Sequence, residues 1–138
     1  MAAHIKDLAV LAVGPNHDAR EQAVSAVAAA RLGAARAHIA GCFHEPELTV
    51  ASVSRRLGIS MRYLQRLFEM SGTSFTAYVN ELRLKRALTL LTETPERRRR
   101  ISDIALEAGF SDLSHFNRMF RFRFGDTPSG VRRIVRGQ

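Results

Sequence analysis

The chain has 138 residues, of which 46% are hydrophobic, and a formal net charge of +8. This length allows one domain or two very small ones, with enough apolar residues for a packed core. A single cysteine, Cys42, excludes an internal disulfide and a Cys-rich zinc site. No apolar run reaches the ~18 residues of a membrane span, and the stretch LAVLAV near the start makes a poor signal peptide. We therefore expect a cytoplasmic protein without a membrane partner.

The positive charge is unevenly distributed along the chain. Residues 1–44 hold four Lys or Arg against three Asp or Glu, so nearly all of the excess lies in residues 45–138. A basic surplus of this kind favours a polyanionic partner, with nucleic acid ahead of an anionic membrane surface.

The spacing of apolar residues predicts helices along the whole chain and no strands. At the N-terminus we expect a short apolar helix over 5–13, an Ala-rich helix to about residue 31 and a third helix to about residue 43. Gly14 and Pro15 should separate the first two of these helices, and Gly33 permits a break before the third.

Capping residues mark the helices that follow. Four residues are suited to the position before a first helical turn: Thr49, Ser60, Asp112 and Thr127. The longest predicted helix starts at Ser74 and ends before Pro95, because proline cannot continue a helix. The expected fold class is all-α.

The second two-thirds of the chain contain the same unit twice. The apolar positions and the glycine of residues 50–59 recur in residues 101–110, at a constant offset of 51. Three further pairs follow at an offset of 52: Leu64 with Phe116, Arg66 with Arg118, and Phe68 with Phe120. The slip of one residue falls in a turn, where insertions cost least. We interpret this repeat as an internal duplication of a helix–turn–helix.

The second helix of each unit has an apolar stripe and a polar stripe. The polar stripes consist of Arg62, Gln65, Arg66 and Glu69 in the first unit, and of Ser114, Asn117, Arg118 and Arg121 in the second. Arginine suits the edge of guanine, and Asn or Gln suits adenine. A glycine in each turn sets the second helix at an angle that lets it enter a major groove. The apolar positions recur because both units pack alike, and the polar positions differ because each unit meets different bases.

Residues 34–138 resemble the DNA-binding domain of AraC/XylS-type transcription regulators. The resemblance rests on SMRYLQRLFEMSGTSFTAYVNELRLKRA and on GFSDLSHFNRMFRFRFGDTPSGVRR. It implies seven helices, with two helix–turn–helix subdomains joined by a long central helix. Residues 1–33 would then be a short helical N-terminal extension, a candidate remnant of a sensory domain. The base-reading positions that the resemblance implies are Arg62, Gln65 and Arg66 in the first unit, and Ser114, His115, Asn117 and Arg118 in the second.

Several of these residues have a second interpretation. Arg97, Arg98, Arg99 and Arg100 form either a solvated loop or a phosphate contact, and Arg121 is a further phosphate candidate. His115 lies three residues after Asp112, a spacing that suggests catalysis. We instead interpret Asp112 as a helix cap and His115 as a packing residue or a DNA contact. Residues 19–31 are either a dimerisation helix or a remnant that packs on the DNA-binding domain or frays, so the oligomeric state stays open.

The function expected from the sequence is that of a sequence-specific regulator bound to double-stranded DNA, without a cofactor, a metal or an enzymatic activity. The alternative is a truncated interaction protein that modulates a longer regulator or RNA polymerase. An enzyme that transfers alkyl groups to Cys42 would need a ligand or base beside the thiol, and the sequence indicates none. We also expect no effector pocket, because residues 1–33 are too short to form one.

Overall fold

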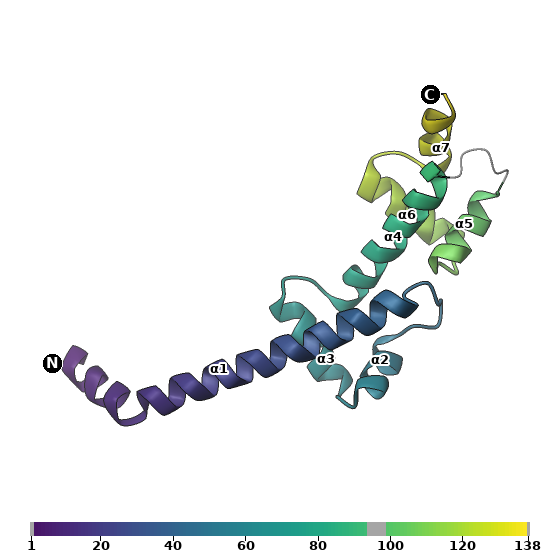
Figure 1. Ribbon diagram of the computed structural model, residues 1–138. Coiled ribbons are helices and arrows are strands. Elements are labelled where there is room, and N and C mark those ends of the chain that lie inside the picture. The colour runs from purple at the N-terminus through teal and green to yellow at the C-terminus, as the bar shows by residue number, and fades with distance from the viewer. Residues whose placement is uncertain (1, 94–98, 138) are drawn as a thin grey trace.

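The computed structural model describes residues 2–93 and 99–137, with side chains from residue 16 onward. Within these residues the chain forms seven α-helices and no strand (Figure 1). They are α1 (Ala2–Cys42), α2 (Val50–Leu57), α3 (Met61–Met70), α4 (Phe75–Glu93), α5 (Ile101–Ala108), α6 (Leu113–Phe124) and α7 (Pro128–Arg136). The expected all-α fold is confirmed.

The N-terminal third forms one helix where three were expected. Helix α1 runs through Gly14, Pro15 and Gly33 and is 41 residues long. The predicted helix ends at these positions are wrong because breakers are energetic penalties rather than stops. A glycine costs about 1 kcal/mol and a proline about 3 kcal/mol relative to alanine. Around Gly33 the neighbouring alanines favour helix strongly enough to offset that cost.

Helix α1 extends away from the rest of the molecule as an arm (Figure 1). The side chains of residues 16–27 are all exposed, including Val24 and Val27. Burial begins at Ala28, and Ala35 and Ile39 are fully buried. Packing against the remaining helices therefore starts within the last third of α1.

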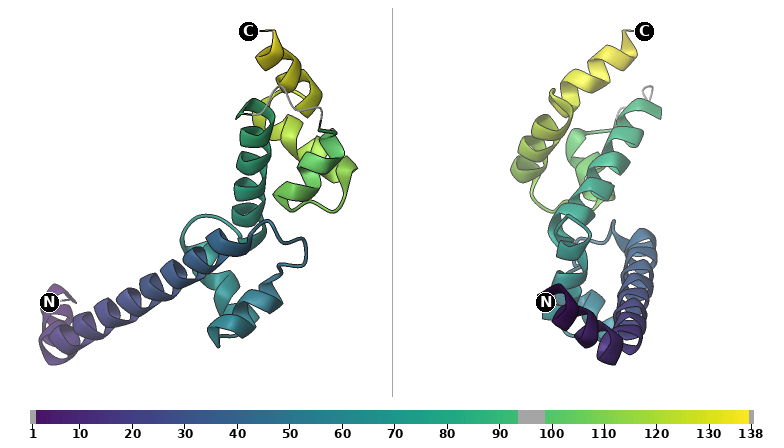
Figure 2. Two further views of the ribbon diagram at one scale, coloured as in Figure 1. Left: turned by 45° about the vertical axis from the view of Figure 1, so that its right-hand side comes forward. Right: turned by 90° about the vertical axis from the view of Figure 1, so that its left-hand side faces the viewer.

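The helices form two lobes at opposite ends of α4 (Figure 2). The first lobe contains the last part of α1, α2, α3 and the start of α4, and the second contains the end of α4, α5, α6 and α7. The buried residues of the first lobe are Ala35, Ile39, Val53, Leu64, Phe68, Phe75 and Val79. Those of the second lobe are Leu84, Ala87, Leu90, Leu91, Ile104, Ala105, Ala108, Phe110, Phe116 and Phe120. Each lobe therefore has its own core, and α4 contributes to both.

The apolar residues that repeat in the sequence occupy equivalent places in the two cores. Val53 and Ile104 are at most 1% exposed, and the pairs Leu64–Phe116 and Phe68–Phe120 are fully buried. The larger aromatic core of the second lobe is a series of tilted rings, with Phe116 and Phe120 centred 5.6 Å apart. These burials agree with the interpretation that both units need the same packing.

The predicted N-caps are confirmed. The side chains of Thr49, Ser60, Asp112 and Thr127 each accept a hydrogen bond from a backbone N–H of the first turn of α2, α3, α6 and α7, respectively. Ser74 does the same for the N–H of Ala77 in α4. Helix α4 ends at Glu93, and Pro95 lies outside the described residues.

Arg83, in the middle of α4, connects the two lobes. Its Nε donates to the carbonyl oxygen of Phe43 at 2.7 Å, and its Nη2 to that of Glu45 at 2.9 Å. Gly109, in the turn of the second lobe, lies against the same groups, since a Cβ there would be 2.7 Å from Arg83 Nε and 2.9 Å from the Phe43 oxygen. Burial lowers the pKa of the Arg83 guanidinium, which stays charged at neutral pH. The turn of the second unit is thus held directly against the segment that follows α1.

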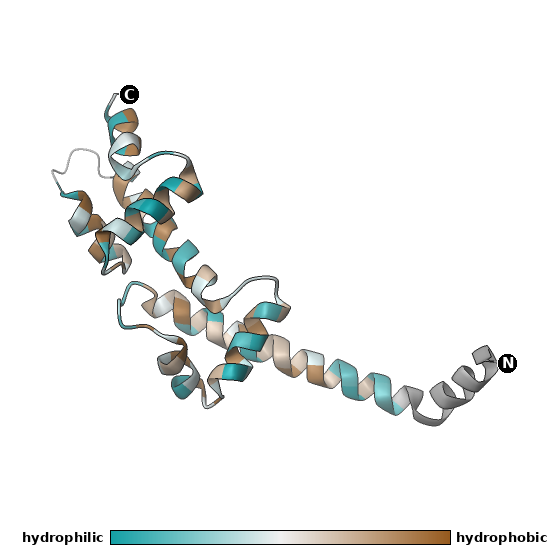
Figure 3. Cartoon of the chain, turned by 180° about the vertical axis from the view of Figure 1, so that it is seen from behind, coloured by the Kyte–Doolittle hydropathy of each residue, from teal (hydrophilic) through white to brown (hydrophobic). Residues whose placement is uncertain are grey.

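The helices of both lobes carry hydrophilic as well as hydrophobic residues (Figure 3). In the part of the chain that the structure describes, no helix has a stretch long and apolar enough to cross a membrane.

Candidate DNA-binding surface

Helix α3 turns a polar face to solvent. Ser60 starts the helix by accepting the backbone N–H of Tyr63 at 3.1 Å. Leu64, Leu67 and Phe68 then fall on one stripe and are buried in the first lobe. The opposite stripe contains the predicted base-reading residues of this unit, which are all exposed: Arg62, Gln65 and Arg66. Their side chains make no hydrogen bond or ion pair with the residues that the structure describes, so they are free to meet a ligand.

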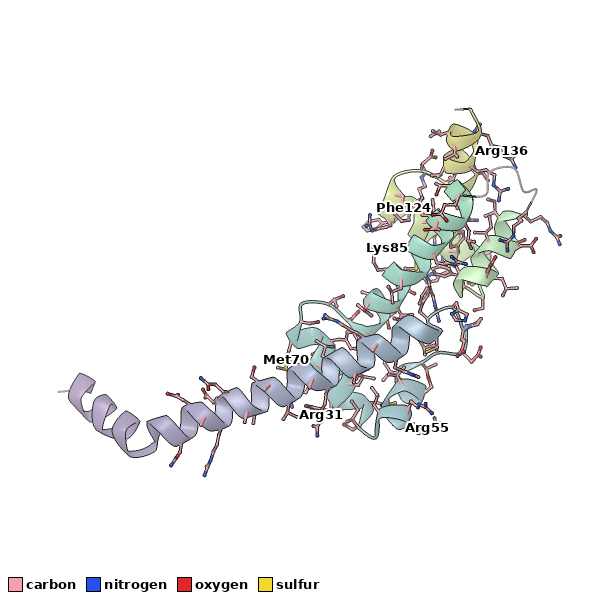
Figure 4. All side chains as sticks on the ribbon, viewed as in Figure 1. Arg31, Arg55, Met70, Lys85, Phe124 and Arg136 are labelled. Atoms are coloured by element: carbon pink, nitrogen blue, oxygen red, sulfur yellow. The ribbon has the colours of Figure 1, made fainter. Side chains whose placement is uncertain are left out.

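Helix α1 contacts α3 through a pair of residues that the sequence did not indicate. The Arg31 guanidinium donates to the hydroxyl of Tyr63 at 3.3 Å, and its centre lies 5.4 Å from the centroid of the Tyr63 ring. Figure 4 shows Arg31 where α1 passes α3. The two residues are 32 positions apart, so no local spacing could have paired them.

Helix α6 shows the corresponding arrangement in the second lobe. The side chain of Asp112 accepts the backbone N–H of His115 at 3.2 Å, which starts the helix. Phe116 and Phe120 point into the core, and this fixes which face is turned outward. The predicted DNA contacts on the outer face are all exposed: Ser114, His115, Asn117, Arg118 and Arg121. The sequence repeat is therefore matched by two exposed polar helix faces, one on each lobe.

Arg66 and Arg118 are the equivalent cations of the two units. Both are exposed on the outer face of the second helix of their unit, and both lack a partner among the described residues. The guanidinium of an unpaired, exposed arginine presents a planar fork of N–H donors. This fork suits the two acceptors on one guanine edge.

The pair of Asp112 and His115 shows no catalytic arrangement. The carboxylate of Asp112 caps α6, which confirms the interpretation of Asp112 as a helix cap. The ring of His115 lies edge-on to that of Phe110, with centroids 6.5 Å apart. Nowhere in the described residues are three His, Cys, Asp or Glu side chains placed to hold a metal ion.

Half of the arginine run is described by the structure. Arg97 and Arg98 lie outside the described residues. Arg99 pairs with Glu107, and Arg100 Nε lies 3.4 Å from an oxygen of Asp103. The Arg100–Asp103 pair is exposed, and such pairs are worth about 0–1 kcal/mol, so a DNA phosphate could replace Asp103. Arg99, by contrast, is half-buried. The phosphate role of these residues stays a prediction.

Cys42 is half-buried at the end of α1. Its Sγ lies 3.1 Å from the carbonyl oxygen of His38 and 3.7 Å from Nε2 of the same residue. A histidine therefore lies beside the thiol, where the sequence indicated no base. However, burial and the nearby Glu45 carboxylate both raise the pKa of the Cys42 thiol. The thiol form is favoured over the reactive thiolate, which disfavours alkyl transfer.

An open groove of about 530 Å³ lies between α4 and α6. We expected no effector pocket because residues 1–33 are too short to form one, and none of these residues lines the groove. The groove is formed instead by residues of α4 and α6, so it does not contradict the expectation about residues 1–33.

Two helix–turn–helix units at opposite ends of α4, each with an exposed polar face on its second helix, define a double helix–turn–helix protein. A family model described as a helix-turn-helix domain matches residues 53–134, which is more than half of the chain. The transcriptional activator RhrA of Rhizobium meliloti (strain 1021) is 40% identical over 87 residues, covering 63% of this chain and 27% of that protein. The chain thus spans only about a quarter of the length of this relative.

Solved structures agree with the family match. A probable AraC family transcriptional regulator from Rhodopseudomonas palustris is 28% identical with a TM-score of 0.69, covering 76% of this chain and 96% of that one. A transcriptional regulator with an AraC-type DNA-binding domain from Chromobacterium violaceum is 33% identical with a TM-score of 0.64, covering 78% and 93%. This chain belongs to the AraC/XylS-type family of helix–turn–helix proteins.

Proposed function

We propose that this chain is a sequence-specific transcription regulator that binds double-stranded DNA with α3 and α6 in successive major-groove segments. The observation that carries the proposal is the pair Arg66 and Arg118, which occupy equivalent exposed positions and lack partners among the described residues. The net charge of +8 supports it, because the phosphate backbone supplies much of the affinity of such proteins.

The spacing of the two recognition helices is set by α4 and by Arg83. Helix α4 has 19 residues, and at ~1.5 Å per residue it is about 28 Å long. This length is comparable with the ~34–36 Å that separate successive major-groove segments on one side of B-form DNA. Where the two distances differ, DNA would have to bend, at an elastic cost of about 1–6 kcal/mol. The contacts of Arg83 make it hard for the lobes to adjust instead.

The division of the chain follows from the same proposal. We assign residues 34–138 to the DNA-binding domain and residues 1–33 to a helical extension. Packing begins at Ala28, close to this boundary, while α1 itself continues across it. The extension would then reach the recognition surface only through its last turns, for example through the contact of Arg31 with Tyr63.

Selection of bound sequences from a random DNA library tests the proposal. We expect a bipartite site whose halves are about 10.5 base pairs apart. Arg66→Ala should relax sequence preference in one half and Arg118→Ala in the other, each at a cost of roughly 1–3 kcal/mol. Arg20→Ala is the matched control, because Arg20 is an exposed arginine on the distant arm of α1.

Two results would contradict this proposal. If both variants lose preference at the same base pairs, or lose affinity with preference intact, the two helices are not independent readers. If the chain leaves no footprint on any selected DNA, the proposal that it binds DNA directly is wrong. The interaction protein that modulates a longer regulator or RNA polymerase would then be the function to pursue.

A further inference from the structure

The groove between α4 and α6 has an apolar interior. Leu84, which is 3% exposed, and the half-buried Met119 both line it. Phe122 lines it as well, although its side chain is 94% exposed. The Phe122 ring therefore adds exposed apolar surface beside the hollow, where a ligand in the groove could contact it. The volume of about 530 Å³ lies within the roughly 300–1,000 Å³ of small-molecule pockets.

The charges around the groove are not balanced. Arg123 and Glu81 neutralise each other, with Arg123 Nε 2.9 Å from both carboxylate oxygens of Glu81. Arg118 also lines the groove and has no partner among the described residues. The groove therefore combines an apolar surface with one uncompensated cation, and it is complementary to a molecule with an apolar body and a single negative charge.

The position of Phe122 argues against bases as the occupant of this hollow. It is the tenth of the twelve residues of α6, whereas the base edges are contacted by the N-terminal residues of a recognition helix. Arg118 lies one turn earlier, between that end and Phe122. The same arginine is thus placed to meet either DNA or a molecule in the groove.

We propose that this groove binds a small amphipathic carboxylate. Its hydrocarbon part packs on Leu84, Met119 and Phe122, and its carboxylate pairs with Arg118, where a bidentate contact is available. Because Arg118 cannot serve the carboxylate and a guanine at once, the ligand competes with DNA. This second step rests on the proposed DNA-binding function, whereas binding to the groove does not.

Octanoate is a suitable probe, with octanol and octylammonium as neutral and cationic counterparts of the same chain length. In NMR titrations of the full chain without DNA, we expect saturable octanoate shifts centred on Met119 and Phe122. Octanol and octylammonium should bind at least about tenfold more weakly, a difference of about 1.4 kcal/mol. Equal binding of octanoate and octanol would show that the groove does not select a carboxylate. The absence of a saturable shift at these residues would show that the groove is not the binding site. Either result would contradict the proposal.

Variants locate the site. Phe122→Ala removes an exposed side chain, so the fold should stay intact while octanoate affinity falls at least about fivefold. Leu106→Ala is the matched control, because Leu106 is also an exposed apolar residue but lies on α5 outside the groove. If both variants bind octanoate as the unaltered chain does, the ligand is elsewhere and the proposal is wrong. The apolar side chain of a protein partner would then be the remaining occupant.

Competition is measured by fluorescence anisotropy of labelled DNA with increasing octanoate. We expect the apparent Kd for DNA to rise in proportion to octanoate concentration above its own Kd, and to rise less with Phe122→Ala. Binding of octanoate without any effect on DNA would overturn the competition. A chain that binds octanoate at Phe122 but no DNA would instead contradict the proposed function and leave the site in place.

Discussion

Gly58 and Gly109, in the turns of the two units, should differ in how much free energy of unfolding is lost when each is replaced by alanine. Gly58 has φ 70° and ψ 29°, and a Cβ there would meet nothing within 4 Å. Gly58→Ala should therefore cost only the strain of the left-handed conformation, about 1–2 kcal/mol. Gly109 has φ 114°, further from the region that other residues adopt, and its Cβ would lie 2.9 Å from the Phe43 carbonyl oxygen. Overpacking of this kind adds about 1–3 kcal/mol, so Gly109→Ala should cost about 2–5 kcal/mol.

Urea unfolding followed by circular dichroism measures this difference. We expect Gly109→Ala to lower the free energy of unfolding by at least about 1 kcal/mol more than Gly58→Ala does, from the added contact. In an Arg83→Ala background the extra cost should shrink, since the Cβ would otherwise lie 2.7 Å from Arg83 Nε. It should not vanish, because the backbone oxygen of Phe43 remains. Equal losses for the two alanine variants would refute the close approach of the second turn to the segment after α1.

Three further predictions concern single features of the chain. Replacing Arg97–Arg100 by serine should flatten the log–log dependence of DNA affinity on salt, whose slope is roughly −0.9 per phosphate neutralised, without changing sequence preference; an unchanged slope would mean a solvated run. Asp112→Ala should lower the free energy of unfolding by about 0.5–2 kcal/mol through loss of the cap, and Asp112→Asn, which still caps, should recover most of it in the same urea titration. Iodoacetamide at pH 7.5 should modify Cys42 more slowly in the folded chain than in urea, because the raised thiol pKa leaves less thiolate; an equal or faster rate in the folded chain would contradict this.

Much of the fold was predictable because it follows local rules. Thr49, Ser60, Asp112 and Thr127 could be identified as caps, since a cap depends on a side chain and the backbone three residues later. The duplicated apolar positions indicated which face of α3 and α6 is buried, and the exposed faces follow from the 3.6-residue period of a helix. The exposure of Arg66 and Arg118 was predictable for the same reason, whereas their contact with DNA stays a prediction.

The N-terminal helix shows where local rules fail. Gly14, Pro15 and Gly33 are breakers, yet α1 continues through all three. A breaker changes the local free energy by about 1–3 kcal/mol, and the remainder of a long helix can outweigh it. Whether it does so depends on sums over many residues and on the packing of Ala35 and Ile39 in the first lobe.

Sequence alone thus determined the secondary elements after α1, the two cores and the outward faces, since each depends on neighbours within a few residues. Tertiary structure alone decided how the lobes meet and what lies between helices. Arg83 bonds to the oxygen of Phe43, 40 positions away, and Arg123 to Glu81, 42 positions away. The groove beside Phe122 is lined by residues of both α4 and α6, which only the packing of the two helices brings together. Such contacts depend on the angle between packed helices, which the bulk of many side chains sets jointly and which no single motif encodes.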